Sequence, residues 1–121
     1  MSDRMLREDA LRRRMKELAA QFLTRTEDEV VRIRSMVEGR NADHVALEPL
    51  IMLAHKICGT ASTFEFEAIS ACAAELEKKA TALSTAAGLQ TSDVEQLARL
   101  ASRLSQAVEH FRRAAAAPVA P

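Results

Sequence analysis

One histidine stands out because its neighbours suit a reactive and accessible side chain. His55 lies in the stretch AHKICGTASTFEF, and Gly59 follows it by four residues. A glycine inside a helix costs about 1 kcal/mol relative to alanine, so its presence in a strong helix-forming stretch needs a reason. Residues four apart share one helix face, and Gly59 therefore removes a side chain next to the imidazole. The spacing favours a histidine ring that a partner can approach closely.

The apolar pattern around His55 predicts which face of a helix it occupies. The expected buried side of a helix over residues 47–63 carries Leu47, Leu50, Ile51, Ala54, Ile57, Cys58 and Ala61. By the 100° step per residue, the opposite or boundary side carries Met52, His55, Lys56, Gly59 and Thr63. We therefore expect an exposed imidazole, with the positive charge of Lys56 beside it to help hold an anion.

The other two histidines give a weaker signal. His44 falls in a predicted connection, and His110 lies near a predicted helix end, where a cation is favourable. No two of the three histidines are paired at helical i, i+4 spacing, so the sequence predicts no metal site.

Composition indicates a single all-α domain. The chain has 121 residues, rich in helix formers, with three glycines, three prolines and no Trp or Tyr. Its 17 basic and 17 acidic side chains give no net charge, which argues against nucleic-acid binding. A local basic cluster at residues 12–16 is interpreted as a solvated helix face.

Targeting and redox signals favour the cytoplasm. The N-terminus is charged, unlike a signal peptide, and no apolar run approaches the roughly 20 residues needed to span a membrane. Cys58 and Cys72 belong to no CxxC pair and fall at apolar positions, so we expect free, buried or half-buried thiols.

Periodicity and capping signals predict five helices, at about 2–23, 27–38, 47–63, 66–83 and 92–113. Alternatively, the break at residues 24–26 is slight and the first two helices run nearly continuously. The first carries an apolar stripe made of Leu11, Met15, Leu18 and Phe22.

Capping residues set the expected boundaries. Thr26 with Glu29, and Ser92 with Glu95, fit capping boxes at the starts of the second and fifth helices. Gly39 is expected to end the second helix, while Asp43 is a candidate cap and Pro49 a first-turn residue for the third.

Helices of this length with short links favour an antiparallel up-down-up-down four-helix bundle, with the additional N-terminal helix at its end or side. We expect one domain over residues 1–113 and a disordered tail over residues 114–121.

The stretch from Ala54 to Glu77 resembles the signature of histidine-containing phosphotransfer (HPt) domains. It is also similar to the phosphotransfer domain of chemotaxis histidine kinases. The matching residues are His55, Ile57, Gly59, Thr60 with Ala61, Phe64, and Leu76 with Glu77. The stretch departs from the family at Cys58, where a lysine is common, and at Glu65, where a glycine is common.

The resemblance implies a phosphorelay intermediate of a two-component system. A receiver-domain aspartate of a response regulator would give a phosphoryl group to the far ring nitrogen of His55, which would pass it to another receiver. Lys56, Gly59 and Glu77 would form the phosphoryl environment, with Glu77 bonded to the other ring nitrogen. Met52, Lys56, Gly59 and Thr63 would form the docking surface.

The resemblance also implies which components the chain lacks. Mg²⁺ would sit on the receiver, a histidine kinase would act upstream, and the protein would be a monomer with no cofactor of its own. The sequence has no glycine-rich nucleotide loop, so we expect a phosphocarrier rather than an enzyme.

Two other functions stay open at this stage. The chain is alternatively a helical binding module that docks a receiver or kinase domain without carrying phosphate, or a structural bundle that dimerises. Glu77 is alternatively an ordinary solvated charge.

Overall fold

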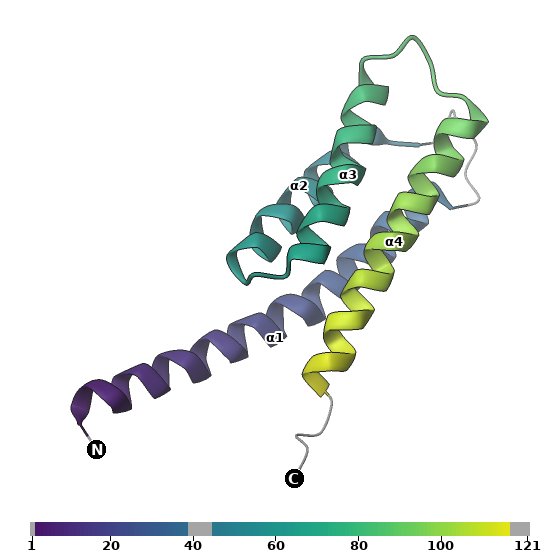
Figure 1. The fold of residues 1–121 in the computed structure, drawn as a ribbon. Coiled ribbons are helices and arrows are strands. Elements are labelled where there is room, and N and C mark those ends of the chain that lie inside the picture. Colours follow the sequence, from purple (N-terminus) through teal and green to yellow (C-terminus); the bar gives the residue numbers. More distant parts are fainter. Residues whose placement is uncertain (1, 39–44, 117–121) are drawn as a thin grey trace.

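The structure is a computed structural model that describes residues 2–38 and 45–116, and within these ranges its regular elements are all helices (Figure 1). They are α1 (Asp3–Val37), α2 (Leu47–Thr63), α3 (Glu67–Ser84) and α4 (Thr91–Ala116). The all-helical fold class is therefore confirmed.

A single helix, α1, replaces the two helices expected at 2–23 and 27–38. The prediction of a separate N-terminal helix is therefore wrong, and the alternative of a continuous run through residues 24–26 is confirmed. The hydroxyl of Thr24 donates to the carbonyl of Ala20 one turn back, a bond that a continuous helix accommodates. Thr26 is fully buried and its hydroxyl has no partner among the described residues, so it caps nothing. The expected capping box with Glu29 is wrong for the same reason.

The first half of α1 extends beyond the other helices, as Figure 1 shows. Leu11 and Met15 are 63% and 41% exposed, whereas Phe22, on the same stripe, is buried. Periodicity predicted an apolar face correctly, but this face begins to be covered only where other helices lie against it.

The second half of α1 joins the other three helices around one core. α2 packs against α3, α4 packs against both α1 and α3, and α1 also contacts α2. At one end of the core, Phe22 lies against Phe64 and Phe66, and Phe66 lies 4.8 Å from Phe111 between ring centroids. The short turns between helices favour an antiparallel order, which stays a prediction.

α4 differs from expectation at both ends. It begins at Thr91, and the carboxylate of Asp93 accepts a hydrogen bond from the backbone N–H of Gln90 at 2.9 Å. Asp93 thus takes the role predicted for Glu95, and the cap expected from Ser92 is wrong because that residue already lies inside the helix.

At its far end α4 continues through Ala116, so residues 114–116 are helical rather than part of a disordered tail. The rest of that predicted tail lies outside the described residues, as do Gly39, Asp43 and His44 with their expected roles.

Candidate functional site

His55 projects from the middle of α2 into solvent. Its side chain is 77% exposed, while its neighbours Ala54 and Ile57 are buried in the core. This arrangement confirms the face predicted from the apolar pattern. Because the buried neighbours fix the rotation of α2, the imidazole has a defined direction of presentation.

A carboxylate from the adjacent helix holds the ring. Glu77 of α3 places Oε2 at 2.8 Å from Nδ1 of His55. An ionised carboxylate accepts hydrogen bonds but donates none, so Nδ1 carries the hydrogen. In the neutral ring the lone pair is then on Nε2, the nitrogen farther from the helix backbone.

Gly59 lies one turn beyond His55 on the exposed side of α2. A Cβ built at this position meets nothing within 4 Å, so packing inside the protein does not require glycine. The hydroxyl of Thr63 donates to the carbonyl of Gly59 at 3.2 Å and so stays close to the helix surface. Gly59 therefore leaves open space on the helix face one turn from the imidazole.

Lys56 does not lie free beside His55. Its Nζ is 3.1 Å from Oε2 of Glu29 on α1. The side chain of Glu29 is only 7% exposed, and its other oxygen lies 4.0 Å from Nε of Arg25. Sequence reasoning missed this contact because it assigned Glu29 to a helix cap. The available signal was the position of Glu29 next to Val30, on the inner face of a helix.

Cys58, at the position where the family often has lysine, faces α3. The hydroxyl of Ser70 donates to the carbonyl of Cys58 at 3.1 Å, and the Cys58 sulfur lies 3.5 Å from the same hydroxyl. This position therefore joins two helices and supplies no cation near His55. Both cysteines are free and half-buried, as predicted.

Glu65, at the position where the family often has glycine, lies in the turn between α2 and α3. Its φ of 61° is in the left-handed region, which a residue with a Cβ adopts at a cost. The family glycine thus has a conformational explanation here. Glu65 thus belongs to the turn and not to the next helix, since α3 begins at Glu67.

An open hollow lies between α1 and α2, next to the histidine. Met52, which is 66% exposed, borders it. The lining residues are Arg32, Pro49, Met52, Leu53 and Lys56. The surface beside His55 is thus apolar with two cationic side chains.

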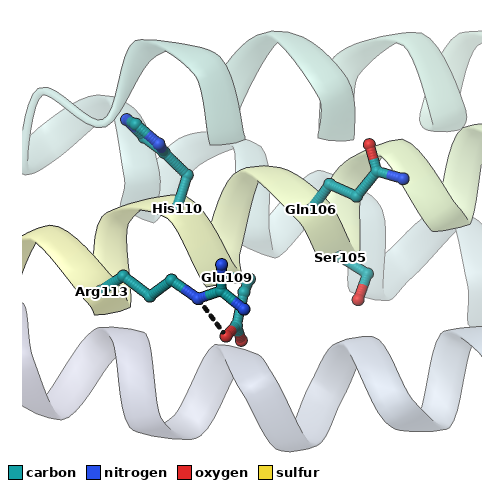
Figure 2. Close-up of a pocket in the computed structure, with 5 residues that line it drawn as sticks. All are labelled: Ser105, Gln106, Glu109, His110 and Arg113. Atoms are coloured by element: carbon teal, nitrogen blue, oxygen red, sulfur yellow. Dashed lines mark hydrogen bonds and ion pairs between the residues drawn. The ribbon is translucent and has the colours of Figure 1, made fainter.

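The second described histidine, His110, lies on α4 beside another shallow hollow (Figure 2). Glu109 and Arg113 pair with each other at 2.9 Å, and Figure 2 shows the imidazole pointing away from that pair. Across residues 2–38 and 45–116, no carboxylate lies within bonding distance of its ring.

A comparison with known families decides which group this geometry belongs to. The family model described as Hpt domain matches residues 17–114, which include all four helices in part or whole. The chain belongs to the Hpt domain family. Hpt domains transfer phosphoryl groups through a histidine in phosphorelays, and their partners are receiver domains and histidine kinases.

The Hpt match begins at Glu17, so most of the projecting part of α1 lies before it. No curated protein and no solved structure shows significant similarity to the chain. None of the described helices is both long enough and apolar enough to cross a membrane.

Proposed function

We propose that this Hpt domain accepts a phosphoryl group on Nε2 of His55 from a receiver-domain aspartate and passes it to another receiver. The observation that carries the proposal is the 2.8 Å contact between Nδ1 of His55 and Glu77. It leaves the outer nitrogen with its lone pair, on a ring that is open to a partner.

The transfer needs only one bond formed and one broken. The Nε2 lone pair attacks the phosphorus of the aspartyl phosphate, and the bond from phosphorus to the aspartate oxygen breaks as the carboxylate leaves. The ring gains positive charge, which the neighbouring carboxylate of Glu77 stabilises. The reverse step on a second receiver restores the neutral imidazole.

The partner supplies the remaining charge neutralisation. Phosphoryl transfer depends mainly on positioning and electrostatics, and the proposed receiver brings the acidic pocket and Mg²⁺. The proposed contact surface consists of Met52, Lys56, Gly59 and Thr63, and the small size of Gly59 permits close approach. The protein acts as a cytoplasmic monomer downstream of a histidine kinase, as a phosphocarrier with no ATP-dependent activity of its own.

The test is incubation with a receiver domain carrying a labelled aspartyl phosphate. Acid-labile, alkali-stable label should appear on the wild type and on His110→Ala, the matched control at the other described histidine, but not on His55→Ala. Label that persists on His55→Ala overturns the assignment.

A second candidate is a binding module that docks a receiver or kinase domain without carrying phosphate. It is favoured by Cys58 standing at the family's lysine position and by the engagement of Lys56 with Glu29. Binding to a receiver that is equally tight for wild type and His55→Ala, together with no detectable transfer, would establish this alternative.

A further inference from the structure

Glu29 is an acidic side chain placed where water hardly reaches it. Among the described residues, Glu29 and Thr26 are the polar side chains counted as buried, and both lie on the inward face of α1. Removing the partner of a buried charge is strongly destabilising, because the remaining charge is left uncompensated. The nearest cation to Glu29 is the ammonium of Lys56, at 3.1 Å.

Lys56 directly follows His55, yet its ammonium is directed to α1. Its side chain is 56% exposed, so packing against neighbouring residues does not fix its position. A lysine stem is long and flexible, and without Glu29 the same ammonium would be available to an anion on the neighbouring imidazole. The ion pair to Glu29 therefore determines whether the ammonium of Lys56 is available to His55.

We propose that Glu29 is a positioning residue that holds Lys56 away from a phosphoryl group on His55 and so keeps that group transferable. This inference rests on the proposed function. An ammonium bonded to phosphoryl oxygens would stabilise the resting phosphohistidine, and this bond would have to break before transfer. Glu29 opposes the bond because releasing Lys56 would leave its buried carboxylate with only the guanidinium of Arg25, at the longer distance of 4.0 Å.

The lifetime of the phosphohistidine measures this effect without a receiver. Phosphoramidate is the probe: Nε2 attacks its phosphorus, the phosphorus–nitrogen bond of the reagent breaks, and ammonia leaves. In the decay, water attacks phosphorus, the Nε2–phosphorus bond breaks, and inorganic phosphate and a proton are released.

The variants are Glu29→Gln, Lys56→Gln and the double variant, with Glu27→Gln as control. Glu27 is an acid on the same helix that pairs with Arg112 instead.

Glu29→Gln should lengthen the lifetime about fivefold, which is the scale of one partly exposed charge pair. The same change in the Lys56→Gln background should have no effect, and Glu27→Gln should behave as wild type. Circular dichroism melts establish that each variant is folded. If Glu29→Gln does not fold, Glu29→Met replaces it, since an apolar side chain of similar size suits a buried position.

The outcomes separate the two proposals. If phosphohistidine forms on His55 but has the same lifetime in wild type and in Glu29→Gln, the proposed role of Glu29 is overturned and the proposed function stands. A lengthening of the lifetime that persists without Lys56 also overturns it. If wild type takes no more label than His55→Ala, the proposed function fails and this inference fails with it.

Discussion

The two described histidines share high exposure but differ in what surrounds them. His55 on α2 receives a carboxylate from α3 and has a glycine one turn further along its helix. His110 on α4 lies beside an ion pair made within its own helix, and within the described ranges 2–38 and 45–116 no acid bonds to its ring (Figure 2). Under the proposed function, exposure alone therefore does not prepare an imidazole for phosphoryl transfer. The difference comes from a second helix that fixes the ring from the side.

The largest expected effect comes from closing the space beside His55. Gly59→Leu should slow transfer from a receiver by about 10²-fold, because a bulky side chain displaces the partner from the reacting nitrogen. The matched control is Ala114→Leu, which stands four residues after His110 as Gly59 does after His55. Stopped-flow or gel-based transfer rates give the measurement. A normal rate for Gly59→Leu would show that the partner does not approach along this side.

The next largest expected effect on the transfer rate comes from removing the carboxylate of Glu77. Glu77→Ala should slow transfer about tenfold, through loss of one charge-assisted hydrogen bond that fixes the ring. Glu75→Ala is the control, since Glu75 lies two residues earlier on α3 and pairs with Arg103 at the surface. Transfer rates and thermal melts should be compared for both variants. Equal transfer rates for Glu77→Ala and Glu75→Ala would show that Glu77 is an ordinary solvated charge.

A smaller effect, on the stability of the fold, is expected from changing Glu65 in the turn that follows α2. Glu65→Gly should raise the free energy of unfolding by about 1 kcal/mol, because glycine adopts a positive φ without the steric cost of a Cβ. Urea denaturation measures the change, and Glu38→Gly at the end of α1, where φ is negative, is the control. A loss of stability in Glu65→Gly would mean that its side chain makes a compensating contact.

The smallest effect concerns Cys72, on the same helix as Glu77. Burial raises the pKa of the Cys72 thiol above 9.0, Glu75 raises it further and Arg103 opposes them. At pH 8 the thiolate is thus rarer in the folded protein than in the unfolded chain, and alkylation by iodoacetamide should be slower. Glu75→Gln should lower the pKa and speed the reaction. Mass spectrometry of the Cys72 peptide follows it, and an unchanged rate in that variant would contradict the influence of Glu75.

The direction of His55 could be predicted because helical periodicity fixes which residues of one helix are buried. The contact with Glu77 joins two helices, and only the family resemblance suggested it. The pair between Glu29 and Lys56 could not be predicted, since it depends on how α1 is rotated against α2. The false break at Thr24–Thr26 shows that residues typical of helix caps also occur within a helix, where the hydroxyl bonds one turn back or is buried.

The open space around a Cβ at Gly59 has an evolutionary consequence. Alanine would fit there and would favour the helix by about 1 kcal/mol, so glycine lowers the stability of this domain without any benefit to packing. Laboratory selection for heat resistance alone would therefore enrich Gly59→Ala, while selection for signalling would retain glycine. Competing the two variants under each regime would separate the demands of folding from those of the partner.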